Sequence, residues 1–230
     1  MREKLAIWGA ASQALIVADI IRLRDQYEIA GFLDNVNPER ARTTFCGASI
    51  LGGEEQLDDL RQRGVTHLIC AFGINRIRLQ LAQLAHDKGF QLASAIHPAT
   101  AIASGVPIGA GTVVMAGVVI NPGTRLGTSV VVSANASIQH ECAIEDGVWI
   151  NTAAILGGRV TVERAATIEM GACIAGELRI GAGSVVGAGS LVLHDVPDNV
   201  LAYGAPAKVI RGIAGHDYRF SRMTRALADH

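Results

Sequence analysis

Apolar residues recur at every sixth position over the second half of the chain. From residue 102 to residue 192 each sixth residue is Ile, Leu or Val, sixteen times without a break. At average composition, this agreement by chance is on the order of one in a billion. A period of six fits neither an α-helix nor simple strand alternation. The positions are Ile102, Ile108, Val114, Ile120, Leu126, Val132, Ile138, Ile144, Ile150, Leu156, Val162, Ile168, Ile174, Ile180, Val186 and Val192.

This pattern predicts a solenoid of short strands with a tight corner every six residues. Three strands make one triangular coil, so eighteen residues advance the chain by about 4.8 Å, one strand spacing. Small residues four places after the periodic ones, such as Thr112 and Ala136, are expected to point inward as well. Trp149 is the only aromatic residue between Ile102 and Val196 and is expected to point outward, because a narrow prism has no room for rings.

The first hundred residues show a different pattern, in which apolar runs alternate with helical periodicity. We expect strands at 5–9, 28–33, 66–72 and 91–96 and helices at 12–24 and 75–88, which together predict a small parallel α/β domain. In such sheets ligands bind at the carboxyl ends of the strands. Those ends carry Gly9, Asp34 and Gly73.

Polar residues near these ends are candidate ligand contacts. Asp34 is suited to hydrogen-bond a base or ribose, and Gly73, Asn75 and Arg76 are suited to approach a pyrophosphate; Asn75 is alternatively a helix N-cap. The loop from Gly9 lacks two of the three glycines of a dinucleotide fingerprint, which disfavours a nicotinamide cofactor. Two roles for this loop remain open: a turn that serves packing alone, or a contact with a nucleotide or a sugar.

Composition narrows the classes of partner. The net charge of −1 gives no argument for nucleic acid, and no apolar stretch reaches the roughly 18–20 residues of a membrane span. The four cysteines show no metal-binding spacing, and we expect reduced thiols in a cytoplasmic protein without a signal peptide. The expected division is an α/β domain at 1–98, a β-helix at 99–211 and a tail at 212–230 that is basic through Arg219, Arg222 and Arg225.

Several motifs give the layout a family resemblance over residues 5–211. The chain resembles the hexapeptide-repeat sugar acetyltransferases of the sialic-acid O-acetyltransferase and bacillosamine-pathway N-acetyltransferase type. The resemblance implies a Rossmann-like nucleotide-sugar domain before a left-handed parallel β-helix, a homotrimer, and acetyl-CoA in the groove between adjacent β-helices, in polysaccharide biosynthesis. The motifs are Gly31-Phe32-Leu33-Asp34, His97-Pro98, the hexapeptides with His140-Glu141, and Tyr203-Gly204-Ala205-Pro206-Ala207-Lys208.

Two positions depart from the family pattern. Gln13 stands where relatives usually have His in the first loop, and it can hydrogen-bond but cannot titrate as His does. Trp149 stands where many relatives have a second His. Contacts with the nucleotide sugar and the path of the pantetheine arm are therefore the parts where this chain is expected to differ.

The repeat that contains His140 supplies the candidate catalytic residues. His140 lies two residues after the inward Ile138, at a corner where its side chain projects outward, and is a candidate general base that Glu141 would orient. Gly158 lies eighteen residues further on, so its N–H is a candidate oxyanion donor. Cys142 is expected to be core, so no acyl-enzyme is needed. A solvated corner histidine and an ordinary corner glycine are the alternatives.

The acetyl-CoA groove is expected to involve Gly187, Ala188, Pro206 and Lys208, the last toward a CoA phosphate unless it is a simple surface charge. A zinc site of the β-helical carbonic anhydrase kind is disfavoured, because within the repeat only His140 and His194 are available, about three coils apart. The expected reaction is N-acetylation of a nucleotide-linked 4-amino-4,6-dideoxy sugar. O-acetylation of a sialic-acid type sugar and a non-catalytic scaffold stay open.

Overall fold

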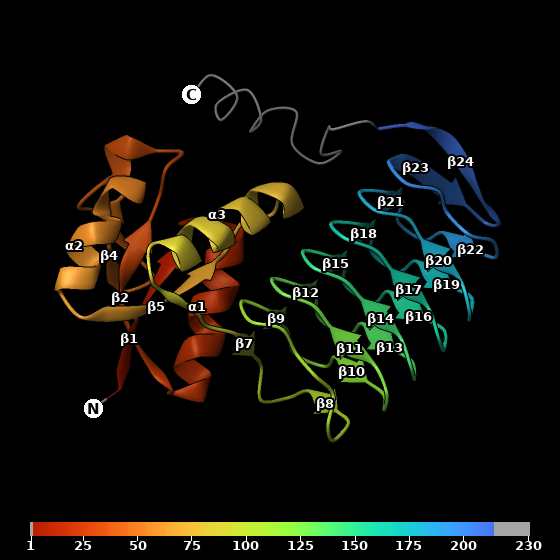
Figure 1. Cartoon of the computed structure of the whole chain (residues 1–230), viewed down its shortest axis with the longest axis horizontal. Coiled ribbons are helices and arrows are strands. Elements are labelled where there is room, and N and C mark those ends of the chain that lie inside the picture. The colour runs from red at the N-terminus through yellow and green to blue at the C-terminus, as the bar shows by residue number, and fades with distance from the viewer. Residues whose placement is uncertain (1, 214–230) are drawn as a thin grey trace. The chain divides into compact units, whose positions relative to one another are not determined.

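The computed structural model describes residues 2–213, which form two compact units (Figure 1). The first unit runs up to Ala95 and the second begins at Ile96. Apart from residues 212 and 213, the expected basic tail with Arg219, Arg222 and Arg225 lies outside the described residues. Among the described residues no helix is long and apolar enough to cross a membrane.

The first unit is built around a six-stranded sheet in the order β3-β4-β2-β1-β5-β6. Strand β1 pairs in parallel with both β2 and β5, and only β3 is antiparallel to its neighbour. Each buried face of the sheet is covered by apolar residues of the helices, such as Val17 and Ala85. The elements are β1 (Glu3–Trp8), α1 (Ser12–Arg24), β2 (Tyr27–Leu33), β3 (Thr44–Phe45), β4 (Ala48–Gly52), α2 (Leu57–Gln62), β5 (Val65–Cys70), α3 (Asn75–Asp87) and β6 (Gln91–Leu92), with short 3₁₀ turns at Pro38–Arg40 and Glu54–Gln56.

The sequence pattern missed three elements of this unit and misassigned part of a fourth. Strands β3 and β4 and helix α2 are short, and each contains too few apolar residues for a periodicity to be read. The strand expected at 91–96 is two strands. β6 joins the α/β sheet, whereas β7 (Ala95–Ile96) pairs with the first strands of the β-helix, so this expectation was wrong for its second half.

The second unit is a parallel β-helix, which confirms the solenoid prediction. Its short strands end on the periodic Ile, Leu and Val residues, and Ile108 forms a single bridge with Leu126. Figure 1 shows the coils stacked in order from β7 to β24. The strands are β8 (Ala101–Ile102), β9 (Val113–Val114), β10 (Val119–Ile120), β11 (Arg125–Leu126), β12 (Val131–Val132), β13 (Ser137–Ile138), β14 (Ala143–Ile144), β15 (Trp149–Ile150), β16 (Ile155–Leu156), β17 (Thr161–Val162), β18 (Thr167–Ile168), β19 (Cys173–Ile174), β20 (Arg179–Ile180), β21 (Val185–Val186), β22 (Leu191–Val192), β23 (Val200–Gly204) and β24 (Ala207–Gly212).

Strands eighteen residues apart pair in register, so each face of the prism is one parallel sheet. Ile120 pairs with Ile138, and Ile138 pairs with Leu156, along the sheet formed by β8, β10, β13, β16, β19 and β22. The periodic residues and the small residues four places later form a single buried core. This apolar stack is the main source of stability, since each fully buried aliphatic side chain contributes roughly 1.5–3 kcal/mol.

Trp149 lies outside the core of the prism, as expected, yet it is only 7% exposed. Its indole Nε1 donates a hydrogen bond to Ser133 Oγ at 3.0 Å, one coil below. A buried indole N–H needs an acceptor, and Ser133 supplies one. The outward position of this residue is therefore a packed environment and not a solvated one.

Candidate active site

The centre of the candidate site is the corner that follows β13, where His140 projects from the prism with a side chain that is 51% exposed. Its Nδ1 lies 3.0 Å from Glu141 Oε2, so the two predicted residues are in contact. Glu141 reaches this position because its backbone is left-handed, with φ of 57°. When Nδ1–H donates to the carboxylate, Nε2 keeps the lone pair that a general base uses.

Gly158 forms the seat of the imidazole ring. A β-carbon at this position would lie 2.6 Å from His140 Nε2 and 2.7 Å from Cε1, so only glycine leaves room for the ring. Among residues 2–213, the backbone N–H of Gly158 makes no hydrogen bond, whereas the neighbouring Gly157 N–H donates to Ile174 O at 2.9 Å. The corner thus offers a base and an uncommitted backbone donor next to one another.

Arg159 is a charged neighbour that the sequence analysis missed. Its Nη1 lies 3.5 Å from Glu141 Oε2, and its guanidinium also pairs with Glu177. The hydrogen bond from His140 lowers the pKa of Glu141, and the charge of Arg159 lowers it further. The signal was present in the sequence, because Glu141, Arg159 and Glu177 follow one another at the eighteen-residue interval of the coil.

Cys142 is close to His140 but belongs to the core. It is fully buried, and its Sγ donates to Gly157 O at 3.2 Å. Burial raises the pKa of this thiol, which leaves it protonated at neutral pH. The structure confirms the expectation that Cys142 belongs to the core.

The candidate residues of the α/β unit lie along one edge of its sheet. Gly9, Asp34 and Gly73 follow β1, β2 and β5, and these three strands are neighbours. Gly9 N–H donates to Leu33 O at 2.8 Å, and a β-carbon on Gly9 would lie 2.7 Å from Ala71 O. The carboxyl ends of the strands therefore converge. Glycine is required at position 9 because the backbone there lies so close to the backbone of Ala71.

Asp34 is 5% exposed and organises the turn that follows β2. Its Oδ1 accepts hydrogen bonds from the backbone N–H of Val36 and Asn37, and its Oδ2 accepts one from Arg40 at 3.1 Å. Arg40 also donates to Ala10 O at 2.8 Å and so ties the turn to the first loop. No motif pointed to Arg40, because its proximity to the loop depends on a turn that the pattern did not predict.

The other residues of this edge differ in their surroundings. The side-chain nitrogen of Gln13 is buried and makes no hydrogen bond among the described residues. Asn75 is the first residue of α3, one place after the N-cap Ile74, and its Oδ1 accepts from Arg78 at 3.0 Å. Its alternative role as an N-cap was therefore wrong, and Arg76 is exposed.

The residues expected around acetyl-CoA lie away from the corner of His140. Gly187 and Ala188 follow β21, on a different edge of the prism, and Gly187 packs against Tyr203. Ala188, Pro206 and Lys208 are exposed, and Lys208 lies on β24 opposite Tyr203. Within one chain, the structure does not bring these four residues to His140.

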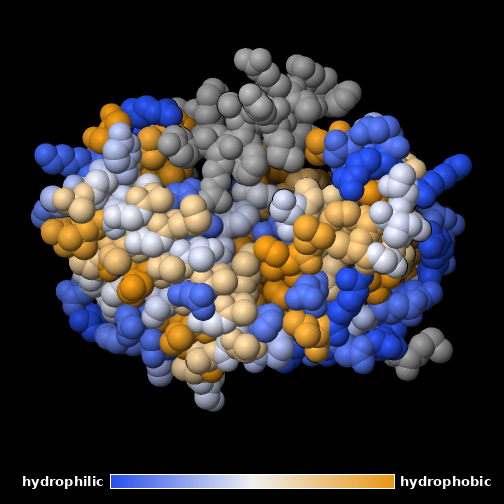
Figure 2. All heavy atoms as spheres, turned by 180° about the vertical axis from the view of Figure 1, so that it is seen from behind, coloured by the Kyte–Doolittle hydropathy of each residue, from blue (hydrophilic) through white to orange (hydrophobic). Residues whose placement is uncertain are grey.

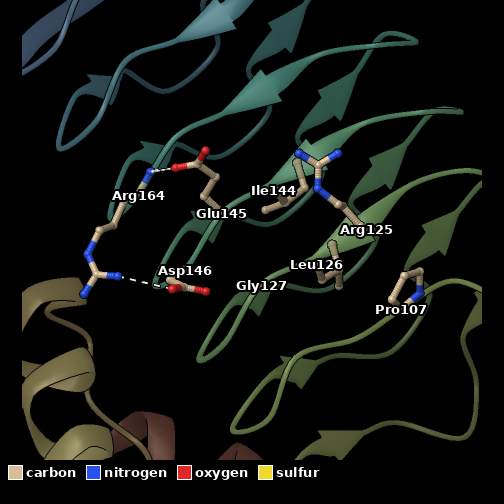
Figure 3. A pocket seen from close by; sticks show the side chains of 8 residues that line it. All are labelled: Pro107, Arg125, Leu126, Gly127, Ile144, Glu145, Asp146 and Arg164. Carbon is tan, nitrogen blue, oxygen red and sulfur yellow. Dashed lines mark hydrogen bonds and ion pairs between the residues drawn. The ribbon is translucent and has the colours of Figure 1, made fainter.

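An open pocket on the β-helix is lined by none of the predicted site residues (Figure 3). Arg164 lies at one side of the pocket, where its backbone N–H donates to Glu145 Oε2 at 2.9 Å and its side chain donates to Asp146 Oδ2 at 3.2 Å. No group of His, Cys, Asp and Glu in residues 2–213 has the arrangement of a metal site. The pocket is lined by Pro107, Arg125, Leu126, Gly127, Ile144, Glu145, Asp146 and Arg164.

A corner histidine on this parallel β-helix lies beside a carboxylate and an uncommitted backbone N–H, which are groups that an acyl transfer can use. Comparison with known proteins shows the family of the chain. Residues 4–85 match the family model of the PglD N-terminal domain. The chain belongs to the hexapeptide-repeat sugar acetyltransferases, a family of enzymes that use acetyl-CoA.

Two solved structures are similar over nearly the full length. The GDP-perosamine N-acetyltransferase of Caulobacter crescentus, in complex with CoA and GDP-perosamine, is 34% identical, with a TM-score of 0.86, and the match covers 90% of this chain and 97% of that one. The acetyltransferase domain of PglB from Neisseria gonorrhoeae, in complex with acetyl coenzyme A, is 32% identical, with a TM-score of 0.84 and coverage of 91% and 100%.

Curated relatives match only over a short stretch. The galactoside O-acetyltransferase of Lactococcus lactis is 55% identical over 42 residues, which are 18% of this chain and 20% of that protein. The serine acetyltransferase of Buchnera aphidicola is 36% identical over 56 residues, again 20% of its length. The chain therefore matches about one fifth of these relatives, and they agree on acetyl transfer with different acceptors.

Proposed function

We propose that the protein transfers an acetyl group from acetyl-CoA to the amino group of a nucleotide-linked 4-amino-4,6-dideoxy sugar. The observation that carries this proposal is the contact of His140 with Glu141 and Gly158, on a fold whose full-length relative is an N-acetyltransferase for GDP-perosamine. The absence of a candidate thiol nucleophile at the corner favours direct attack on the thioester, because Cys142 is buried and protonated.

In the proposed mechanism the neutral amine attacks the thioester carbonyl while His140 Nε2 accepts a proton from it. A nitrogen–carbon bond forms, and the Gly158 N–H stabilises the negative charge on the carbonyl oxygen. The carbon–sulfur bond then breaks, and the imidazolium returns its proton to the CoA thiolate. Glu141 holds the ring by its Nδ1 side throughout, so that Nε2 faces the reacting atoms.

The nucleotide is proposed to bind at the edge formed by Gly9, Asp34 and Gly73. Because the Asp34 carboxylate is already engaged in its turn, its role is to shape the loop together with Arg40. The buried nitrogen of Gln13 is a donor suited to a sugar or phosphate oxygen. Gly73, Asn75 and Arg76, which follow β5 at the same edge, are proposed to approach the pyrophosphate.

A homotrimer is the proposed assembly. Along one face of the prism the outward residues of β10, β16 and β22 are apolar and exposed, namely Val119 (38%), Ile155 (46%) and Leu191 (39%). They lie on alternate strands of one sheet, with Ser137 and Cys173 between them, and Figure 2 shows apolar residues interspersed with polar ones over the viewed surface. Contact between copies would cover this ladder and place Gly187, Ala188, Pro206 and Lys208 of one copy within reach of a cofactor bound against another.

An acceptor panel tests the proposed reaction. The purified protein and acetyl-CoA are incubated with GDP-, UDP- and dTDP-linked 4-amino-4,6-dideoxy sugars and with free sialic acid, and thiol release is measured. Turnover on one amino sugar, absent for the same nucleotide sugar with a 4-hydroxyl group, would support N-acetylation. Turnover on sialic acid alone would favour the O-acetyltransferase alternative.

The scaffold alternative makes a different prediction in the same experiment. A non-catalytic β-helix would neither bind acetyl-CoA nor release thiol with any acceptor, while remaining folded. If no acceptor gives turnover, acetyl-CoA binding is measured by calorimetry. Binding would mean that the panel lacked the right acceptor, whereas no binding would favour the scaffold. We place the reaction in the cytoplasm, because acetyl-CoA and four unpaired cysteines suit a reducing compartment.

A further inference from the structure

Asn35 follows β2, and its side chain is held in one orientation. Its Oδ1 accepts a hydrogen bond from Trp8 Nε1 at 2.7 Å. Trp8 is fully buried at the end of β1, and its indole N–H can only donate, so it needs an acceptor. The oxygen of the Asn35 carboxamide therefore faces the indole, and the nitrogen lies on the other side.

The nitrogen of this carboxamide is an available hydrogen-bond donor. Asn35 is partly buried, but its Nδ2 is neither buried nor hydrogen-bonded within residues 2–213. The neighbouring Asp34 carboxylate is occupied by its own turn and by Arg40. Of the two residues, Asn35 is therefore the one with a polar group to offer to a ligand.

Glu55 places a carboxylate beside this donor. A β-carbon at Gly53, which follows β4, would lie 2.8 Å from Glu55 Oε2 and 3.4 Å from Asn35 Oδ1, so the two side chains flank the same point. Gly53 N–H donates to Glu55 Oε1 at 2.7 Å, and this hydrogen bond holds the carboxylate in place and lowers the pKa of Glu55. An ionised carboxylate accepts several hydrogen bonds, so Glu55 keeps lone pairs for a ligand.

The place of this pair in the sheet points to the base of a bound nucleotide. In sheets of this kind the pyrophosphate lies at the loop after the first strand, and the ribose lies at the end of the second. The strand order β4-β2-β1 continues in the same direction to β4. Since the Asn35 carboxamide lies against Gly53, a nucleotide that follows this edge presents its base to Asn35 and Glu55.

We propose that Asn35 and Glu55 bind the base of the nucleotide and select one that carries a carbonyl group next to a ring N–H. Guanine, uracil and thymine have this edge: Asn35 Nδ2 donates to the carbonyl oxygen, and Glu55 accepts from the ring N–H. Adenine and cytosine carry an amino group next to an unprotonated ring nitrogen, which opposes donor to donor and acceptor to acceptor. This inference rests on the nucleotide site of the proposed function and narrows the class of sugar nucleotide that enters it.

The test is a calorimetric titration of the full chain with GDP, ADP, UDP and CDP, which share the ribose and the diphosphate and differ in the base. The comparison is made within one ring size, GDP against ADP and UDP against CDP. In the ring size that binds more tightly, the nucleotide with the carbonyl should bind roughly tenfold or more tightly than its amino counterpart. The same comparison tells guanine from uracil. Equal affinities within that pair, or tighter binding of the amino nucleotide, would overturn the proposal.

Two variants assign the preference to these side chains. Asn35→Asp keeps an acceptor for the Trp8 indole but replaces the donor with an acceptor, so the carbonyl nucleotide should bind roughly tenfold or more weakly while the amino nucleotide does not weaken. Glu55→Gln should narrow the preference in the same way. Asn135→Asp and Glu54→Gln are matched controls at exposed positions and should leave it unchanged. Equal weakening of all four nucleotides in Asn35→Asp would place Nδ2 on the ribose or the diphosphate and overturn the proposal.

The titration needs no acetyl transfer, so it separates this inference from the proposed reaction. The expected base preference, together with no acetylation of any nucleotide-linked amino sugar, would retain the base site and refute the reaction. Acetylation of an amino sugar, together with equal affinities within each pair of nucleotides, would do the reverse. If none of the four nucleotides binds, both this inference and the proposed nucleotide site are refuted.

Discussion

At the scale of single residues, the site depends on Gly158, which leaves space for the imidazole of His140, and on Glu141, which orients that ring. His140 can lie against the chain only because position 158 has no side chain, and Glu141 can turn toward it only because its backbone is left-handed. The sequence placed His140 at an outward corner, and this was correct. The contact with Glu141 was expected as an orienting role, but the sequence could not show that the two side chains face each other, since adjacent residues do so only in particular backbone conformations.

Gly158→Ala should disable the site without unfolding the protein. The backbone at Gly158 is not left-handed, but the new methyl group would displace the imidazole by occupying the space 2.6 Å from Nε2. A misplaced base should lower kcat on the best acceptor by roughly a hundredfold. Gly212→Ala is the control, because its nearest neighbour would be 4.0 Å away, at Asn199 O. Equal rates for the two variants would contradict the seating role of Gly158.

Thiol reactivity tests the burial of two cysteines. Burial raises the pKa of Cys70 to about 12, so at pH 8 roughly one molecule in ten thousand carries the thiolate. We expect Cys70 and Cys142 to react with a thiol reagent only after denaturation, whereas Cys46 and Cys173 are partly exposed. Because the folded-state pKa of Cys70 is raised, its contribution to stability is complete below pH 9 and declines as the pH rises toward 12. Mass spectrometry of the labelled native protein identifies the sites, and rapid labelling of Cys70 would refute the packing.

At the scale of elements, the β-helix was predictable almost residue by residue and the α/β unit was not. The inward position recurs every six residues along the β-helix, so each repeat supports the register assigned to the others. In the α/β unit β4 and α2 occur once each and are short, and the position of Arg40 depends on the turn before them. The strand at 91–96 was misassigned because local apolarity does not say which sheet it joins.

The prediction at this scale compares inward and outward residues of neighbouring strands. Leu156 is fully buried in the prism, so Leu156→Ala should lower the free energy of unfolding by about 2–4 kcal/mol. Thr161→Ala, whose side chain is outward on β17, should change it by less than about 0.5 kcal/mol. Thermal or urea unfolding followed by circular dichroism gives both values, and comparable losses would contradict the core assignment.

At the scale of the whole molecule, the exposed apolar ladder is the feature that requires an explanation. Apolar side chains exposed on alternate strands of one sheet, as here at Val119, Ile155 and Leu191, suit an interface between chains. Introducing a charge in the middle, as in Ile155→Arg, should convert a trimer into smaller species while the coil itself stays folded. Light scattering after size exclusion measures the mass, with Thr161→Arg on another face as the control. If the Ile155→Arg variant remains a trimer, the interface lies on a different face.

Acetylation of the best nucleotide-linked 4-amino sugar by wild type and by His140→Gln, measured as kcat/KM with the product identified by mass spectrometry, tests the proposed reaction and its base together. We predict an acetylated amino sugar and a loss of roughly a hundredfold or more in His140→Gln, which keeps a hydrogen-bonding side chain but removes the base. Full activity of His140→Gln would contradict the role of His140 as the base, and acetylation of a hydroxyl group in place of the amine would contradict the proposed reaction.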